Sequence, residues 1–382
     1  MFISLVVIIN MVLDMKTILV VGLGRVGYRT FTYLKELYPD ASFLLVDIDK
    51  RKLRAIGKVE NVETYEYAPG ILGKLGERAD VAVTALPSTI AMRCILELVG
   101  HCINVVDVSF IKEDPYVLNK VVEDCFTYLV VDAGFAPGYS NIVAGYAYHE
   151  LGLNEDIEIA VGGIPEKPIP PIGYTVTWSA RDLLEEYVRP ARLIENHEVK
   201  AVNPLEYVRT IEIPSLGSLE AFASDGLRTM LRNIKARNLR ELTLRWPGHL
   251  SAMKLLHDLG FLDEVEIEVE GVKVKPVDFT ATILEKKLSL HVNDLAILQV
   301  LARSDDGKYY REIAILPGKP ENPATPVFTA LVHAYTVKIA LDKKIKPGVI
   351  APEELYTYKH EYEEFLANKG VLIRKDSNIP GP

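Results

Sequence analysis

The sequence lacks several patterns that mark common protein classes. Its three cysteines, Cys94, Cys102 and Cys125, form no C-x-x-C pair, so they predict neither a disulfide framework nor a zinc site, and a reducing cytoplasm fits best. The formal net charge of −9 disfavours general binding to nucleic acid or anionic lipid. There is no H-E-x-x-H, P-loop or G-x-S-x-G pattern, and no internal repeat. We therefore expect a cytoplasmic protein that holds no metal, contacts no membrane and binds a small molecule.

No apolar run is long enough to suggest a membrane anchor. The run in residues 1–14, MFISLVVIINMVLD, is shorter than the roughly 20 residues that span a bilayer. It has no basic residue before it and no small-residue cleavage site after it. We expect a short extension or a mis-assigned start, with Met15 as the natural first residue.

What is present indicates a globular protein of about two domains. The chain has 382 residues, of which 49% are hydrophobic and 25% charged. This length exceeds one ordinary core, and domains of about 100 to 200 residues are typical. We therefore expect two lobes with a cleft for a small ligand.

The first part of the chain alternates short apolar runs with helical stretches, as βαβ units do. This pattern predicts an N-terminal Rossmann domain with a doubly wound parallel sheet over residues 15–137. The expected strands are 17–22, 42–47, 81–86, 103–108 and 128–133. The expected helices are 25–38, 49–56, 90–99 and 114–124.

The pattern changes after Pro137, where strands and helices no longer alternate strictly. We expect a second, α+β domain over 138–318, with an antiparallel sheet that could carry a dimer interface. Its expected strands are 157–163, 175–179, 265–274 and 279–288, and its expected helices are 139–151, 181–187, 226–236 and 249–258. A loop rich in proline and glycine then leads to C-terminal helices, 319–382, which we expect to return to the first domain.

The strongest local signal is the glycine pattern of residues 22–27, GLGRVG, between a strand and a helix. Gly22 allows the tight turn, Gly24 removes a side chain that would block a pyrophosphate, and Gly27 lets the helix approach the sheet. The helix N-terminus, with Arg25 and Val26, would present N–H groups to the phosphates. The alternative is a tight turn in a domain that binds no nucleotide.

An acidic residue follows this pattern at the end of the next predicted strand. Asp47 would accept hydrogen bonds from a ribose 2′-OH and repel a 2′-phosphate, which favours NAD over NADP. Lys50 and Arg51 weaken this preference, because they could pair with a phosphate. NAD is therefore the expected cofactor, with NADP as the alternative.

Other predicted strands of the first domain also end in polar residues or tight loops. The carboxyl ends of parallel strands border the ligand crevice, so these residues are candidates to surround a cofactor and its substrate. The candidates are Leu86, Pro87, Asp107, Ser109, Asp132, Gly134 and Phe135. Either aspartate could act as a general base, or could equally cap a loop or pair with an arginine.

Four residues of the second domain are further candidates. Tyr174 and Ser179 lie on a predicted strand and either border a polar pocket or belong to the core. His249 could transfer a proton near neutral pH, and Arg228 could hold a substrate carboxylate. Structural roles are the alternative for both.

The ordered segments VGLGRVG, ALPST, VVDVSF, DAGFAPGYSN, GGIP, PPIGYTVTWS, LEAFASDGLRT and RWPGH resemble the saccharopine dehydrogenase and lysine 6-dehydrogenase family. The resemblance covers nearly the whole chain after Met15. It implies a Rossmann domain, an α+β domain, a C-terminal helical return and a homodimer. It also implies an enzyme of amino-acid metabolism that transfers hydride between a nicotinamide and a C–N bond of a lysine-derived amino acid.

Within that family, the compact length and the segments DAGFAPGYSN and SDGLRT look closer to lysine 6-dehydrogenase. The resemblance then implies oxidative deamination of the L-lysine 6-amino group. It matches Gly22, Gly24, Gly27 and Asp47 to the cofactor motif, and puts Asp107, Ser109, Asp132, Tyr174 and Ser179 in the motifs of the cleft. The alternatives are a saccharopine dehydrogenase and a nucleotide-binding regulator without catalysis.

Overall fold

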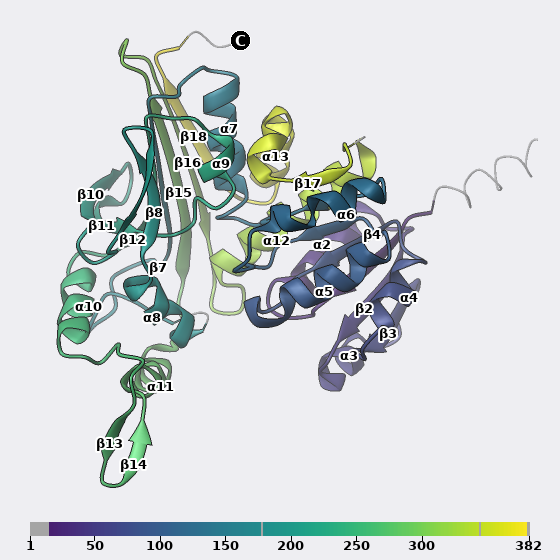
Figure 1. Ribbon diagram of the computed structural model, residues 1–382, viewed down its shortest axis with the longest axis horizontal. Helices are drawn as coiled ribbons and strands as arrows, with labels where there is room; N and C mark the ends of the chain where they lie inside the picture. Colours follow the sequence, from purple (N-terminus) through teal and green to yellow (C-terminus); the bar gives the residue numbers. More distant parts are fainter. Residues whose placement is uncertain (1–14, 177–178, 344, 380–382) are drawn as a thin grey trace, which may run out of the picture. The chain divides into compact units, whose positions relative to one another are not determined.

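The computed structural model describes residues 15–176, 179–343 and 345–379 (Figure 1). The expected extension 1–14 lies outside the described residues. The chain divides into two compact units. Unit 1 comprises the described residues of Met1–Tyr139 with Thr329–Glu354, and unit 2 those of Ser140–Phe328 with Leu355–Pro382.

Unit 1 is built on a seven-stranded sheet with the order β17-β6-β5-β4-β1-β2-β3, in which every pair is parallel. The strands are β1 Thr17–Val21, β2 Ser42–Asp47, β3 Val62–Glu66, β4 Val81–Thr84, β5 Val105–Asp107, β6 Tyr128–Val130 and β17 Gly348–Ile350. The helices between them are α2 Gly27–Leu37, α3 Lys50–Ile56, α4 Ile71–Gly76, α5 Ser88–Gly100, η1 Pro115–Leu118 and α6 Asn119–Asp124. The predicted doubly wound α/β class is confirmed.

The central strands are apolar because both faces of the sheet are covered. In β1, the residues Ile18, Leu19 and Val20 have no exposed surface. Burial on both faces removes the alternation of an exposed sheet and leaves continuous apolar runs. This is why all five strands expected in this part of the chain occur. Strand β3 was not predicted, because all its residues are exposed or half-buried.

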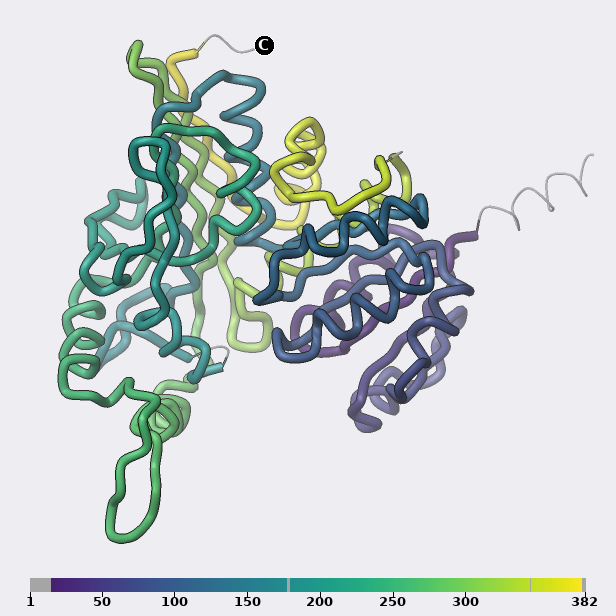
Figure 2. The backbone as a smooth tube through the Cα atoms, in the orientation of Figure 1, coloured from purple at the N-terminus to yellow at the C-terminus, as the bar shows by residue number. Residues whose placement is uncertain are grey.

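The C-terminal part of the chain contributes to both units. Strand β17 pairs with β6 in unit 1, and Figure 2 shows the yellow-green chain of 329–354 beside the blue chain of that unit. Helix α12, Ala324–Asp342, is long and apolar enough to cross a membrane by length and composition, but 67% of that window is buried inside the protein. This burial is typical of a core helix.

Unit 2 contains a nine-stranded sheet with the order β10-β11-β12-β7-β15-β16-β18, to which β8 and β9 are added through β12. Its pairs are antiparallel except for β12 with β7. The strands are β7 Asp156–Pro165, β8 Ala191–Glu195, β9 Glu198–Val202, β10 Val208–Ile213, β11 Gly217–Ala223, β12 Asn238–Arg245, β15 Asp294–Arg303, β16 Tyr309–Pro317 and β18 Leu372–Ser377. The predicted α+β character is confirmed.

The helices of unit 2 are short, and three elements, α7, α12 and η2, cross its boundaries. Helix α7, Tyr139–His149, begins at the last residue of the first segment of unit 1, and η2, Pro352–Tyr358, begins in unit 1. The others are α8 Ala180–Val188, α9 Met230–Asn233, α10 His249–Asp258, α11 Pro276–Leu288 and α13 Lys359–Asn368. Helix α10 has the predicted bounds, whereas α9 is much shorter than the expected 226–236.

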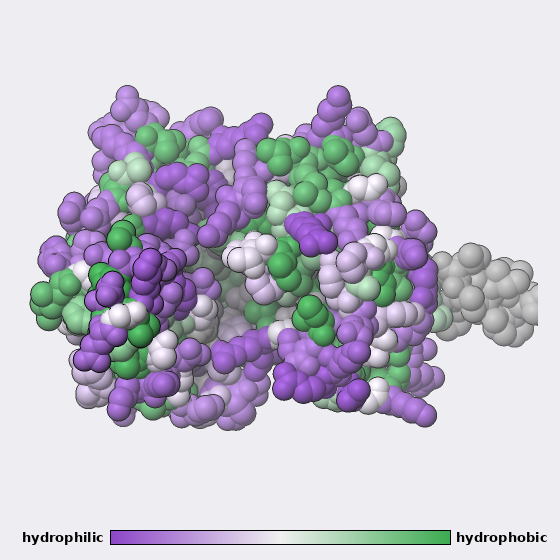
Figure 3. All heavy atoms as spheres, turned by 60° about the horizontal axis from the view of Figure 1, so that its bottom comes forward, coloured by the Kyte–Doolittle hydropathy of each residue, from purple (hydrophilic) through white to green (hydrophobic). Residues whose placement is uncertain are grey.

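A separate two-stranded hairpin, β13 Ile267–Val269 and β14 Val272–Val274, lies within the expected strand region 265–274. Its side chains Ile267, Val269 and Val272 are at least half exposed. Figure 3 shows one face of the molecule, on which exposed hydrophobic residues form small groups in a mainly hydrophilic surface.

The predicted strand 279–288 is wrong, because this segment belongs to helix α11. Pro276 occupies the first turn, where its missing N–H costs nothing, and lysines occupy the last turn, where they complement the helix dipole. The buried residues Val277, Thr280, Ala281 and Leu288 follow the helical repeat rather than a repeat of two. The predicted strand 175–179 is also absent at Thr175 and Val176, while Thr177 and Trp178 lie outside the described residues.

The expectation that the cysteines form no disulfide is also wrong. Cys102, after α5, and Cys125, after α6, are disulfide-bonded with a Cα–Cα distance of 5.2 Å, and Cys94 is free and buried. The packing of the two helices brings together residues that are 23 positions apart. Since disulfides are typical of oxidising compartments, cysteine content no longer supports a reducing cytoplasm.

Candidate functional site

The three glycines of the turn between β1 and α2 meet different surroundings. Gly22 has φ +92°, and its N–H donates to the Val46 carbonyl at 2.8 Å. A Cβ added to Gly27 would lie 1.9 Å from the Gly22 carbonyl oxygen, whereas a Cβ on Gly24 would meet no atom within 4 Å. The first and third glycines are therefore required by the fold, and the open space at Gly24 is where a ligand can approach.

Asp47 is buried at the end of β2 and holds this turn. Its Oδ2 accepts the Leu23 N–H at 2.7 Å and Lys52 Nζ at 3.2 Å, and its Oδ1 accepts the Asp49 N–H at 2.8 Å. A carboxylate has about four acceptor positions, so about one remains for a ribose hydroxyl. The predicted ribose contact stays a prediction, and Asp47 has a structural role as well.

The basic residues beside Asp47 are paired with acidic ones. Lys50 Nζ lies 2.9 Å from Glu66 Oε2, and Arg51 Nη2 lies 2.8 Å from Asp49 Oδ2. The Lys50 and Arg51 side chains are exposed, so breaking either ion pair costs little free energy. The surroundings of Asp47 therefore do not discriminate between NAD and NADP.

Asp107 joins the ends of β4 and β5. Its Oδ1 accepts the hydroxyls of Thr84 at 2.5 Å and Ser109 at 2.7 Å, and its Oδ2 accepts the Ser109 N–H at 3.1 Å. Ser109 Oγ in turn accepts the Leu86 N–H at 2.9 Å. The structure thus brings together three of the predicted residues, Leu86, Asp107 and Ser109.

The buried position of Asp107 changes its protonation. Burial raises the pKa of this carboxyl to about 7, although the hydrogen bonds from Thr84 and Ser109 act in the opposite direction. The nearby Asp132 carboxylate raises it further. Asp107 can therefore change charge near neutral pH, but it has no exposed surface of its own.

The loop after β6 contains Asp132, Gly134 and Phe135, all predicted site residues and all buried. Asp132 has φ +51°, and its carbonyl accepts the Gly134 N–H at 2.8 Å. A Cβ on Gly134 would lie 3.1 Å from the Pro137 carbonyl oxygen, so close packing of the loop already explains this glycine. The peptide bond between Ala136 and Pro137 is cis.

These features of unit 1 fit a dinucleotide. The open position at Gly24 faces no other atom, Arg25 is exposed and Val26 half-buried, and α2 starts directly after them. Helix N-termini with glycine turns are favourable sites for a pyrophosphate. Pro87 is exposed and precedes α5, next to Leu86. Over the described residues, no group of three or more His, Cys, Asp or Glu side chains could hold a metal ion.

In unit 2, the predicted residues Tyr174 and His249 belong to a buried cluster around Arg245. The Arg245 guanidinium lies 4.6 Å from the Tyr174 ring centre, and its Nε donates to the Tyr187 hydroxyl at 3.1 Å. Its Nη2 lies 2.9 Å from Glu186 Oε2. Tyr174 is 2% exposed and packs in the hydrophobic core, which agrees with the core alternative rather than with a pocket.

His249 is also fully engaged in this cluster. Its Nδ1 lies 2.8 Å from the Ile172 carbonyl oxygen, so Nδ1 donates and Nε2 accepts the Tyr187 hydroxyl at 2.7 Å. Burial, followed by the charge of Arg245, lowers the pKa of His249 to about 3. The predicted proton transfer near neutral pH is therefore not supported, because this imidazole stays neutral and both its nitrogens are occupied.

The other two predicted residues of unit 2 are Ser179 and Arg228. Ser179 is exposed and caps α8, where its Oγ accepts the Asp182 N–H at 3.2 Å. Arg228 is half-buried with φ +52°, before α9. For Ser179, helix capping accounts for the residue type.

Three residues of these clusters, Thr84, Tyr187 and Arg245, were not predicted from the sequence. Thr84 was identifiable as the hydroxyl that ends an apolar strand, directly before the loop that was singled out. Arg245 is 2% exposed at the end of the buried strand β12, and a charged residue at an inward position of such a strand is unusual. No local pattern points to Tyr187, whose role depends on contacts with residues about 60 positions away.

Comparison of the sequence with known proteins points to one family. The family model of the saccharopine dehydrogenase C-terminal domain matches residues 134–369. Alpha-aminoadipic semialdehyde synthase from Bos taurus is 24% identical over 275 residues, which cover 65% of this chain and 28% of that protein. Saccharopine dehydrogenase (NADP+, L-glutamate-forming) from Schizosaccharomyces pombe is 22% identical over 269 residues, which cover 66% and 60%.

The fold similarity extends further than the sequence matches. The structure of apo saccharopine dehydrogenase (L-Glu forming) from Saccharomyces cerevisiae aligns with a TM-score of 0.77 and 17% identity, covering 95% of this chain and 100% of that one. At this identity the alignment shows a shared fold. The chain itself matches only 28% of the length of the bovine relative. Since the family model matches more than half of the chain, the protein belongs to the saccharopine dehydrogenase family.

Proposed function

We propose that the protein is a nicotinamide-dependent oxidoreductase that acts on a C–N bond of a lysine-derived amino acid. The observation that carries the proposal is the turn of residues 22–27, whose second glycine faces open space directly before a helix. Membership of the saccharopine dehydrogenase family supports the substrate class.

In this proposal, the turn and the N-terminus of α2 hold the pyrophosphate, and Asp47 holds the ribose. Leu86, Pro87, Ser109 and Gly134 border the cofactor. A bound nicotinamide would supply the acceptor for a hydride from the carbon next to nitrogen. Phe135, Tyr174, Ser179 and Arg228 stay predictions as substrate residues, and the buried position of Tyr174 makes it the weakest of them.

Asp107 and Asp132 remain the candidate acid–base groups. With a pKa of about 7, Asp107 is able to hold a proton and release it near neutral pH. Its hydrogen bonds fix the Ser109 hydroxyl, so it would act through Ser109 as a positioning residue. An Asp107→Asn variant should keep the nucleotide affinity but flatten the rise of kcat with pH around 7.

For the reaction, we favour oxidative deamination of the L-lysine 6-amino group. The C–H bond at the ε-carbon loses a hydride, the amine becomes an imine as its proton passes to a base, and water then releases ammonium and leaves a semialdehyde. The second candidate is oxidation of saccharopine, which the names of the relatives favour. A homodimer and an amino-acid substrate are also part of the proposal. The cytoplasmic location stays a prediction, and the Cys102–Cys125 disulfide is evidence against it.

The test measures formation of reduced nicotinamide by the purified protein with NAD+ and with NADP+, using L-lysine or saccharopine. Turnover of lysine would support the first reaction, and turnover of saccharopine alone would support the second. Nucleotide binding without turnover of either compound would contradict both reactions and favour another amino-acid substrate or a regulator without catalysis. The cofactor with the higher kcat/KM would decide between NAD and NADP.

A further inference from the structure

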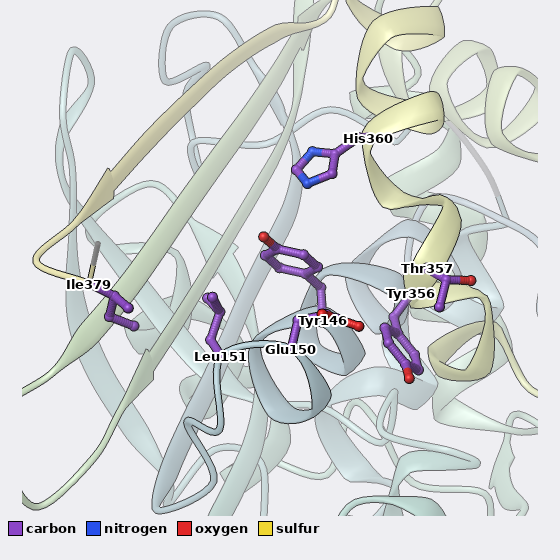
Figure 4. Close-up of a pocket in the computed structure, with 7 residues that line it drawn as sticks. All are labelled: Tyr146, Glu150, Leu151, Tyr356, Thr357, His360 and Ile379. Atoms are coloured by element: carbon purple, nitrogen blue, oxygen red, sulfur yellow. The ribbon is translucent and has the colours of Figure 1, made fainter. Parts of the chain in front are cut away.

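A cavity of about 420 Å³ lies wholly within unit 2, apart from every residue assigned above (Figure 4). Its walls come from the end of α7, the segment where η2 passes into α13, and the chain after β18. The lining residues are Tyr146, Glu150, Leu151, Tyr356, Thr357, His360 and Ile379. This volume is within the range of small-molecule sites.

The lining contains one carboxylate, Glu150, and no lysine or arginine. The cations beside the cavity are already neutralised. Lys359 Nζ lies 2.7 Å from Glu312 Oε2 and 2.5 Å from Glu363 Oε1, and Lys375 Nζ lies 3.1 Å from Glu363 Oε2. The cavity is therefore suited to a cation and not to an anion.

Glu150 stands at an unfavourable place for a carboxylate. It directly follows α7, and its N–H donates to the Tyr146 carbonyl at 2.9 Å, so it continues the last turn of the helix. The C-terminus of a helix carries a partial negative charge, which repels a carboxylate and attracts a cation. A bound cation would interact favourably with the Glu150 carboxylate and with the C-terminus of α7.

One tyrosine ring reinforces this preference. The Tyr356 ring stacks on His149 at 4.6 Å, which fixes its orientation, whereas the Tyr146 ring already has the Lys359 ammonium 4.6 Å from its centre. Aromatic faces attract ammonium groups, especially where water is partly excluded. His360 Nδ1 donates to Glu363 Oε2 at 2.8 Å.

The cavity is also amphipathic. In Figure 4, Leu151 and Ile379 lie together on one side, Tyr356 and Thr357 lie on the other, and Glu150 lies between them. An aliphatic chain would contact the first side while a charged end reaches Glu150 and Tyr356.

We propose that this cavity is a binding site for a small alkylammonium ligand. The ammonium group pairs with Glu150 and lies against the Tyr356 ring, and the alkyl chain packs on Leu151 and Ile379. The site goes beyond the proposed function, because none of its residues belongs to the nucleotide or substrate sites and it needs no turnover.

The test measures binding of n-butylammonium chloride to the full-length protein by isothermal titration calorimetry and by ligand-observed NMR. The uncharged isostere n-butanol is the comparison. We expect saturable binding of the amine, binding of butanol that is weaker by about tenfold, and a loss of about fivefold on Glu150→Gln, as for a surface ion pair with a cation–π contact. Tyr356→Leu should weaken binding, and Tyr356→Phe should preserve it.

Glu364→Gln is the matched control, because Glu364 is an exposed carboxylate of α13 outside the cavity. It should bind the amine as the unchanged protein does. Equal affinities for butylammonium and butanol would overturn the proposal. So would an amine affinity that Glu150→Gln leaves unchanged, which would indicate binding at the proposed substrate site instead.

Discussion

At the scale of single residues, Gly24 and Gly27 lie in one turn but are required for different reasons. A methyl group on Gly27 would contact the backbone of Gly22, whereas one on Gly24 would enter open space. We therefore expect Gly27→Ala to lower the free energy of unfolding by about 2 to 4 kcal/mol, as overpacking against backbone does. Gly24→Ala should leave it within about 1 kcal/mol and weaken NAD(P)H binding at least about tenfold.

Urea unfolding and fluorescence titration with NADH and NADPH measure the two effects on the same samples. Gly100→Ala is the control, because a Cβ there meets no atom within 4 Å and Gly100 lies far along α5 from the turn. If Gly24→Ala bound both nucleotides like the unchanged protein, the turn would not be the pyrophosphate site.

The buried imidazole of His249 predicts a specific dependence of stability on pH. Its pKa is lowered from 6.5 to about 3 in the folded protein, so between these values the unfolded chain binds the additional proton. Above about pH 6.5 the neutral imidazole costs the folded protein nothing. Between about pH 6.5 and pH 3 the free energy of unfolding falls by about 1.4 kcal/mol for each pH unit of acidification. His249→Gln should therefore reduce the slope of stability against pH between about 4 and 6.

Chemical unfolding at a series of pH values measures this slope. His291→Gln is the matched control, because His291 is exposed and its removal should leave the slope unchanged. A slope that is the same with and without His249 would show that the imidazole is accessible to protons, and would restore it as an acid–base candidate.

At the scale of elements, a buried ionic cluster attaches α13 to the sheet of unit 2. Lys359 has no exposed surface and pairs with Glu312 on β16 and Glu363 on α13, while Tyr310 donates to Glu312 at 2.5 Å. Burial opposes the charge of Lys359, but the two carboxylates raise its pKa above the ordinary value. The cluster therefore keeps opposite charges paired away from water.

Removal of Lys359 should be costly, because the buried Glu312 and Glu363 carboxylates would both lose this ammonium group, although Glu363 would keep its contact with Lys375. We expect Lys359→Met to lower the free energy of unfolding by about 3 to 5 kcal/mol. Lys254→Met is the matched control: its pair with Asp258 has the same i,i+4 spacing, but both side chains are 51% exposed. Lys254→Met should change the free energy of unfolding, measured with urea, by less than about 0.5 kcal/mol. A similar small loss for both variants would contradict a stabilising role of the cluster.

At the scale of the whole molecule, the chain passes between the two units at 139/140, 328/329 and 354/355. Each unit has its own sheet, so their stabilities can differ, and a ligand of one unit need not protect the other. At a concentration of 100 times the Kd, a nucleotide should stabilise unit 1 by about 2.7 kcal/mol.

Hydrogen exchange with mass spectrometry distinguishes the two units. Saturating NAD(P)H should slow exchange in β1, β2 and β4, whereas peptides from β15 and β16 should change little. Equal protection of both units would mean that they unfold together, and protection limited to unit 2 would contradict the assigned site.

Local sequence was sufficient to predict the features that depend on neighbouring residues. The strand Ser42–Asp47 and the helix His249–Asp258 were predicted with the bounds observed, and the glycine turn was predicted at its place between a strand and a helix, because turn chemistry and hydrophobic periodicity are local. Helix α11 was misread although its pattern was local, because a short apolar segment resembles both periods.

Contacts between side chains that are distant in the sequence depend on the tertiary fold. It buried His249 against Tyr187 and Arg245, paired Cys102 with Cys125, and turned Asp47 toward the backbone of Leu23. It also brought Lys359, Glu363 and Lys375 together with Glu312 in one ionic cluster. Burial and charge pairing depend on contacts between distant segments, and these contacts set whether a histidine is protonated, a thiol is bonded or a carboxylate is free for a ligand.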